Sequence, residues 1–341
     1  MYSQYIIIIL AAILSTTTLA IILLRDYICQ KLGIIDTPDE KRKIHKKPMP
    51  LIGGLACYIS FILSLIISIL YLEPENIKNL LIFFLISSSI FVFGLLDDRN
   101  NIKASIKSLI FLIIVFLFLP LDQSLIVKHL EFVSLINKPI ILNQGSFFFT
   151  IFCLFLFFNA VNFSDGANGI SIALGIFWIS IIIFKSNSYN LIYLTILFSL
   201  ILLFLFNLGN KLFLGNSGSN LISIIIGMLY IKIYNTEKLF LCDEIFIYFM
   251  IPGLDMVRVT IERILERKSP LSADKSHLHH HLMKTFNQNI VWLPYLSFSI
   301  LPLIILEISH SSLISILVML ILYLIIITFY KKKEKMTNFN Y

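Results

Sequence analysis

Long apolar stretches follow one another along almost the whole chain, separated by short polar segments. Most approach the length of about 20 residues that an α-helix needs to cross the hydrocarbon core of a bilayer. The pattern predicts an all-α polytopic membrane protein with about eleven transmembrane helices. These helices are expected at 5–24, 51–72, 80–96, 104–121, 147–163, 169–184, 189–207, 214–234, 245–254 (extended by its flanks), 291–308 and 312–330.

Composition narrows the class further. The 341 residues are 58% hydrophobic and only 14% charged, whereas a soluble domain carries about 25% charged residues. These values exclude a soluble enzyme, a disordered regulator and a secreted disulfide scaffold. Because no repeat or polar second domain interrupts the pattern, residues 1–341 are expected to form one integral-membrane domain.

The positive charges predict the orientation of the chain. No Lys or Arg precedes the first span and Arg25 follows it directly, so the N-terminus is expected outside. The segments that eleven spans would place inside, including the basic tail 331–341, hold 21 of the 27 Lys and Arg residues. The positive-inside rule thus explains the net charge of +7, and no nucleic-acid partner is expected.

Polar residues gather at the inner ends of the spans and in the inside loops, while the middles of the spans carry almost no charge. Secondary transporters usually place their sites near the midplane, on broken helices. A multispan transporter or flippase is therefore the less favoured alternative. The pattern predicts a cytoplasm-facing site at the level of the lipid headgroups.

The first polar cluster is the loop 36–54, with Arg42, Lys43 and His45 between proline and glycine residues. Taken alone, it is typical of a solvated positive-inside loop. Its proline and glycine pairs make it more rigid than a plain loop needs.

The second cluster is the carboxylate pair Asp97 and Asp98 at the inner end of a span, followed by Lys107. Such a pair is costly there unless it meets water, a cation or a metal. Mg²⁺ commonly takes one or two carboxylates together with substrate phosphates. A helix cap is the simpler alternative.

Two further clusters combine small and amide residues. Asn162, Asp165 and Gly166 break a span at its inner end, and a Gly/Ser-rich segment around Asn216 opens a later span. Exposed backbone N–H groups and side-chain oxygens at such positions can hold phosphate or metal. A plain turn and an ordinary N-cap are the respective alternatives.

The fifth cluster is basic. Asp255, Arg258 and Glu262 fall at helical spacing and share a face, and Arg263 and a histidine-rich segment follow. A zinc site is not expected, because consecutive histidines lack the i, i+4 spacing of a helical zinc pair. Histidines can instead donate to phosphate. The segment contains His277, His279, His280 and His281.

These five clusters, in this order and at these span ends, resemble the bacterial polyprenyl-phosphate N-acetylhexosamine-1-phosphate transferases. The resemblance covers nearly the whole chain and is closer to the WecA-type branch than to the MraY translocases. It implies transfer of an N-acetylhexosamine-1-phosphate, by default the N-acetylglucosamine compound, from a UDP-sugar to undecaprenyl phosphate. UMP would be released and a surface polysaccharide begun.

The resemblance also implies roles for individual residues. Asp97, Asp98 and Asp165 would be catalytic, and Asp98 and Asp165 would hold Mg²⁺, with Mn²⁺ as a substitute. The residues implied to bind substrate are His45, Lys107, Asn162, Arg258, Arg263, His277, His279 and His280. A bacterial inner-membrane location, a bilayer environment and a homodimer are the corresponding expectations.

One position departs from the family pattern. The family usually has Gly-Asp-x-Gly-Ser in the fourth cluster, where this chain has Asn216. An amide oxygen can bind Mg²⁺, but without charge. Asn216 is therefore a doubtful metal ligand, and it is the one feature that favours a catalytically silent homologue.

Overall fold

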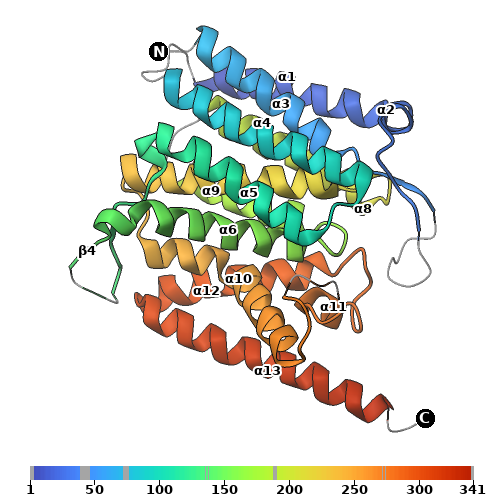
Figure 1. Cartoon of the computed structure of the whole chain (residues 1–341), viewed down its shortest axis with the longest axis vertical. Helices are drawn as coiled ribbons and strands as arrows, with labels where there is room; N and C mark the ends of the chain where they lie inside the picture. Colours follow the sequence, from blue (N-terminus) through green and yellow to red (C-terminus); the bar gives the residue numbers. More distant parts are fainter. Residues whose placement is uncertain are drawn as a thin grey trace.

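The computed structural model describes residues 4–38, 47–71, 77–134, 136, 138–186, 190–270, 272 and 274–338, with side chains up to residue 332. Their regular secondary structure is α-helical apart from two short pairs of β-strands and three 3₁₀ turns, and loops connect these elements (Figure 1). The helices are α1 (Gln4–Leu23), α2 (Arg25–Leu32), α3 (Gly53–Tyr71), α4 (Ile77–Asn100), α5 (Ala104–Phe118), α6 (Ser146–Ser164), α7 (Ile170–Ser186), α8 (Leu191–Leu208), α9 (Gly215–Thr236), α10 (Cys242–Leu265), α11 (Leu278–Leu282), α12 (Trp292–Ser309) and α13 (Ser312–Asn338). The strands β1 (Ile35–Asp36) and β2 (Met49–Pro50) pair antiparallel, as do β3 (His129–Leu130) and β4 (Ile140–Ile141).

Each predicted span coincides with one of these helices, which confirms the all-α membrane fold class. In the described part of the chain, nine helical segments are long and apolar enough to cross a membrane. The other two behave differently: α7 is apolar but has 17 residues, and α10 carries charged residues in its second half. The count of eleven spans therefore remains a prediction.

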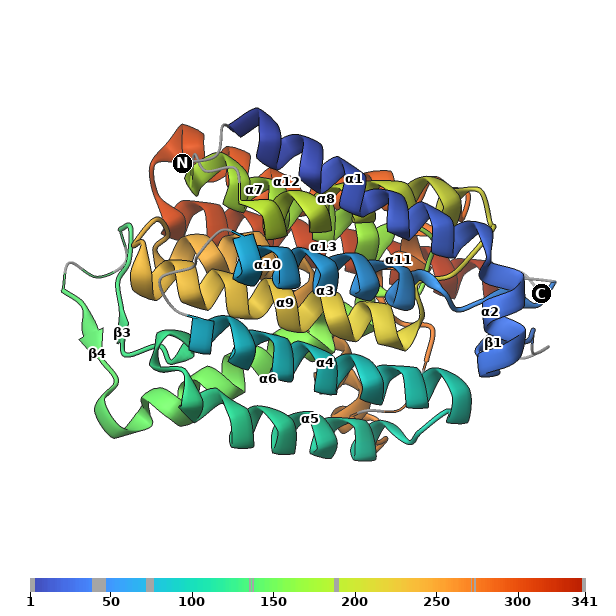
Figure 2. The ribbon, with the colours of Figure 1, turned by 90° about the horizontal axis from the view of Figure 1, so that it is seen from above.

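Helix α9 lies at the centre of the bundle, where it packs against α3, α4, α6 and α7 (Figure 2). Of its most apolar window, 89% is buried, against 17% for α5, which leaves most of its apolar surface on the outside. Small residues allow α3 to approach α9 closely. A Cβ on Gly54 of α3 would lie 2.4 Å from the backbone nitrogen of Gly218 in α9. Such contacts are typical of helix packing in membranes.

The helices lie side by side and form a bundle with two ends. Helix α1 begins at one end and α13 finishes at the other, as an odd number of crossings requires (Figures 1 and 2). The second half of α10 runs across the direction of its neighbours (Figure 1), after Pro252 inside the helix. A proline removes one backbone hydrogen bond and permits such a bend.

Candidate active site

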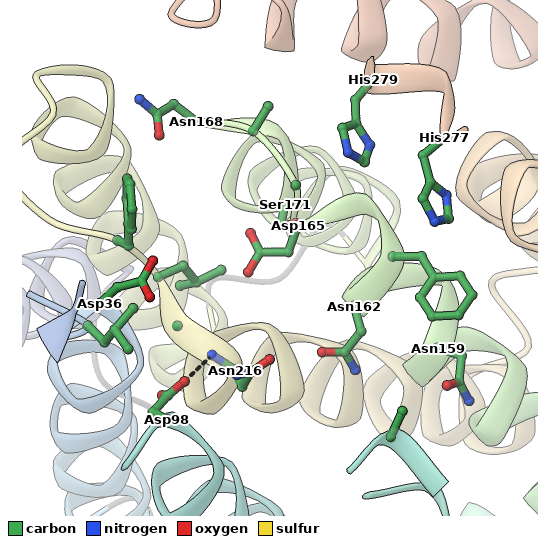
Figure 3. A pocket seen from close by; sticks show the side chains of 18 of the residues that line it. Asp36, Asp98, Asn159, Asn162, Asp165, Asn168, Ser171, Asn216, His277 and His279 are labelled. Atoms are coloured by element: carbon green, nitrogen blue, oxygen red, sulfur yellow. Dashed lines mark hydrogen bonds between the residues drawn. The ribbon is translucent and has the colours of Figure 1, made fainter. Parts of the chain in front are cut away.

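A cavity of about 540 Å³ lies at the end of the bundle where α4, α6, α8 and α10 finish and α5, α7 and α9 begin (Figure 3). We call this end of the bundle the cavity end. Segments from eight helices, α4 to α11, and from the loops between them meet in its wall. Of the residues predicted for the site, the cavity is lined by Asp98, Lys107, Asn162, Asp165, Asn216, Arg263, His277, His279 and His280.

Asp98 joins the end of α4 to the beginning of α9. Its Oδ1 accepts the backbone N–H of Asn216 at 2.6 Å, and its Oδ2 accepts the N–H and the hydroxyl of Ser217 at 3.0 and 2.6 Å. A carboxylate here satisfies the unpaired donors and the positive dipole end of α9. Asp98, a residue of α4, therefore caps the N-terminus of α9, and it also lines the cavity.

Gly215 makes this cap possible in two ways. Its φ of 77° lies in the left-handed region that favours glycine. A Cβ at this position would also lie only 2.7 Å from Oδ2 of Asp98. The glycine at the start of α9 thus leaves room for the Asp98 carboxylate.

Asp97 has a different environment from its neighbour. It is fully buried, its Oδ2 forms an ion pair with Lys107 Nζ, and its Oδ1 accepts the N–H of Ile102 at 2.8 Å. Lys107 lines the cavity and Asp97 does not. The carboxylate thus lies behind the wall, where it holds the lysine in place.

The cavity end of α6 supplies Asn162 and Asp165. The Asn162 amide donates to the carbonyl of Phe158 at 2.9 Å and accepts the hydroxyl of Ser219 at 3.0 Å, so it ties α6 to α9. The helix ends at Ser164, and the Asp165 carboxylate points into the cavity beside Ser171 (Figure 3). Burial, with a smaller contribution from Asp98, raises the pKa of Asp165 to about 7.

His279 and His280 approach the cavity from the other side. His279 is 1% exposed, and neither of its ring nitrogens has a hydrogen-bond partner among the described residues. Burial, and then the neighbouring histidines, lower the pKa of His279 well below the usual range and that of His280 to about 4. The lowered pKa values favour neutral rings at pH 7, and both residues line the cavity.

Arg258 lies outside the lining of the cavity. Its guanidinium donates to Asp255 at 2.8 Å, to Glu262 at 2.9 Å and to the Tyr323 hydroxyl at 2.7 Å. These contacts fasten α10 to α13, so the structure gives Arg258 a scaffolding position rather than one that faces a substrate. His45 lies outside the described residues.

Sequence reasoning missed two carboxylates of the wall. Asp36, on β1, points into the cavity (Figure 3), and Asp274 lines it from the loop before α11. Both belong to polar clusters visible in the sequence. Nothing in their local pattern, however, separates them from the charged residues beside them.

The oxygen donors of the wall fit a magnesium ion. Among the described residues, no three His, Cys, Asp or Glu side chains come together as a complete metal site. Mg²⁺ needs no such group, because it is commonly held by one or two carboxylates, waters and substrate phosphates. The Asp165 carboxylate and the remaining lone pair of Asp98 Oδ1 are ligands of that kind.

The sequence pattern of glycosyl transferase family 4 matches residues 80–234, from α4 to α9. A probable undecaprenyl-phosphate N-acetylglucosaminyl 1-phosphate transferase of Bacillus subtilis is 30% identical over 81% of this chain and 77% of its own length. Undecaprenyl-phosphate α-N-acetylglucosaminyl 1-phosphate transferases of Escherichia coli K12 and Pasteurella multocida are 26% and 28% identical, over 81% and 75% of this chain and 76% and 73% of theirs.

Fold and site together define a polytopic membrane enzyme with a polar cavity at one end of its helix bundle. The chain belongs to glycosyl transferase family 4.

Proposed function

We propose that this enzyme transfers N-acetylglucosamine-1-phosphate from UDP-N-acetylglucosamine to undecaprenyl phosphate and releases UMP. The observation that carries the proposal is the single cavity in which Asp98, Asp165, Lys107, Arg263 and the histidines meet. Its charged groups gather at the end of the bundle rather than at the midplane, which favours an enzyme over a transporter. The product would begin a surface polysaccharide.

The reaction joins two anions at one phosphorus atom. An oxygen of the lipid phosphate attacks the phosphorus next to the sugar, and the bond from that phosphorus to the bridging oxygen breaks. UMP leaves with the bridging oxygen. Because the lipid phosphate is already ionised near pH 7, the protein's main tasks are positioning and charge neutralisation.

The two sides of the cavity suit the two substrates. Lys107 belongs to α5, the span with the least buried apolar surface, so it lies nearest the surrounding lipid and suits the phosphate of the polyprenyl chain. Arg263, His279 and His280 come from α10 and the segment around α11, on the side away from α5, and suit the nucleotide sugar.

We further propose that Asp165 and Asp98 Oδ1 would hold a magnesium ion. The ion would neutralise the diphosphate charge. The protein's own residues hold the two phosphates close, and the neutral histidines present ring N–H groups to the sugar-side phosphate.

The remaining placement also belongs to the proposal. Residues 1–341 act as one membrane domain in a bacterial inner membrane, with the N-terminus outside and the basic tail 331–341 inside. The cavity end then faces the cytoplasm, where UDP-sugars are made. The positive-inside distribution of Lys and Arg supports this placement.

The test is product analysis with purified protein in detergent. UDP-N-acetylglucosamine, undecaprenyl phosphate and Mg²⁺ are expected to yield UMP and a lipid-linked diphosphate sugar, and Asp165→Asn is expected to lower the rate about 100-fold or more. A panel of other UDP-N-acetyl sugars identifies the preferred donor. Absence of UMP with every sugar, at high Mg²⁺ or Mn²⁺, would contradict the proposal.

A further inference from the structure

A buried carboxylate lies directly behind the histidine-rich segment. Asp255 of α10 is 2% exposed. Its Oδ1 accepts the N–H of Leu278 at 2.9 Å, the Tyr323 hydroxyl at 2.8 Å and the Arg258 guanidinium at 2.8 Å. Its Oδ2 lies 2.9 Å from Nδ1 of His277. One side chain thus fixes α10, α13 and the start of α11 relative to one another.

The contacts of His277 define its protonation. Because a carboxylate can only accept, the proton on the ring must be at Nδ1, facing Asp255. The other nitrogen, Nε2, lies 3.2 Å from Nη2 of Arg263. Since a guanidinium can only donate, Nε2 must be the unprotonated acceptor. Both nitrogen atoms of His277 are thus engaged inside the protein.

Arg263 is held from three directions. Its Nε donates to Asp274 at 2.6 Å, its Nη1 to the carbonyl of Pro270 at 2.8 Å and its Nη2 to His277. The guanidinium also lies over the ring of Phe163, 5.2 Å from the centroid. Three of its five N–H groups are used in this way, and two remain in a residue that lines the cavity.

We infer that Asp255 and His277 act as positioning residues, which orient the Arg263 guanidinium toward the nucleotide sugar, and that His277 itself does not contact the substrate. The inference rests on the proposed function and assigns different tasks within the histidine segment. His279 and His280 line the cavity with buried ring nitrogens that have no hydrogen-bond partner among the described residues, whereas His277 serves as the link between a buried carboxylate and a cation.

Two replacements of His277 separate its two contacts. In His277→Gln the longer side chain can place an oxygen near the former Nε2 and still accept from Arg263. In His277→Asn the shorter side chain retains only the donor toward Asp255. We expect His277→Asn to raise the KM for UDP-N-acetylglucosamine about tenfold, the worth of one hydrogen bond to a charged group. We expect the KM of His277→Gln for UDP-N-acetylglucosamine to stay within about threefold of the parent value. Neither variant should change the KM for undecaprenyl phosphate.

A double-mutant cycle provides the second readout. If His277 acts through Arg263, the His277→Asn change should cost little more once Arg263→Lys is present, because the aligned fork is already lost. Guanidinium ion added to Arg263→Ala should restore part of the activity when His277 is intact and less when it is Asn. This readout remains informative should one of the single variants fold poorly.

The matched control is His310→Asn, at the C-cap of α12 and away from the cavity lining, where φ is 51° and asparagine is well tolerated. Its kinetics should equal those of the parent. Equal losses for His277→Gln and His277→Asn, with effects that add to Arg263→Lys, would show direct substrate contact and overturn the inference. Failure of the parent itself to release UMP would instead refute the proposed function.

Discussion

At the scale of single residues, two cations of the cavity are each held by a carboxylate. Lys107 is paired with Asp97 behind the wall, and Arg263 is paired with Asp274 and linked through His277 to Asp255. Fixed charges cost no reorganisation when an anion arrives, which is what electrostatic catalysis requires. The acidic pair 97–98 therefore divides its work: one member holds a cation and the other caps α9.

Asn216 tests how the cavity binds metal. Replacing it with Asp adds a carboxylate at the start of α9, near Asp98, and a divalent cation would relieve the repulsion between them. We expect Asn216→Asp to lower the Mg²⁺ concentration for half-maximal activity about threefold to tenfold. Asn190→Asp, a helix cap at the other end of α8, is the control. An unchanged Mg²⁺ titration would remove residue 216 from the list of ligands.

His280 predicts a pH dependence of stability. Its pKa is about 4 in the folded protein, because of burial, against 6.5 in an unfolded chain. As the pH falls from 6.5 toward 4, the unfolded state takes up a proton that the folded state does not, so the free energy of unfolding decreases. In His280→Gln, the drop in melting temperature between pH 7.5 and pH 5 should be smaller than in the parent. Identical drops in both proteins would exclude a buried neutral His280.

At the scale of elements, the apolar helices were predictable and the contacts at the cavity end were not. Hydropathy located the eleven predicted helices within about five residues at each end, except at the ends of α10 and α13. These continue to Leu265 and Asn338, beyond the apolar runs 245–254 and 312–330. Hydropathy missed α2, which continues almost directly from α1 and has only eight residues. The charged half of α10 escaped prediction as part of a span, because its polar side chains face other polar residues rather than lipid.

The start of α9 yields a prediction for one element. Gly215→Ala would force a left-handed residue to carry a Cβ and would push it against Asp98. We expect a loss of stability on the order of 1–3 kcal/mol and reduced activity, because the Asp98 cap moves with it. A thermal melt in detergent measures the stability.

Gly253→Ala is the matched control for this prediction. Gly253 lies inside α10, and a Cβ there would meet nothing within 4 Å. Alanine favours a helix interior, so the melting temperature should stay the same or rise. If both substitutions changed the melting temperature equally, the close contact between Gly215 and Asp98 would not explain the effect of Gly215→Ala.

At the scale of the whole molecule, the site is assembled from ends of helices that are far apart in sequence. The motifs could be found in the chain, but not that Asp97 and Arg258 would lie behind the cavity wall while Asp36 would form part of it. Those positions follow from how α4, α10 and the β1 segment pack, and packing is not encoded in any local pattern. The types of side chain in the motifs indicated the chemistry of the site. Only the fold distinguished the residues that line the cavity from those that hold them in place.

The predicted orientation applies to the molecule as a whole. A fluorescent protein that matures only in the cytoplasm, fused after residue 341, should fluoresce, whereas alkaline phosphatase fused there should be inactive. Alkaline phosphatase inserted between residues 138 and 139, just before β4 at the other end of the bundle, should be active. The reversed pattern would place the cavity end outside and contradict access to a cytoplasmic nucleotide sugar.

The most direct measurement follows the phosphorus atom itself. UDP-N-acetylglucosamine radiolabelled at the sugar-side phosphorus is incubated with the purified enzyme, undecaprenyl phosphate and Mg²⁺, with Asp165→Asn in parallel. We expect the label to move into the lipid fraction with the parent protein, the UMP formed to be unlabelled, and the variant to be almost inactive. Label that leaves as UDP while unlabelled sugar joins the lipid would show glycosyl transfer instead and would contradict the central claim.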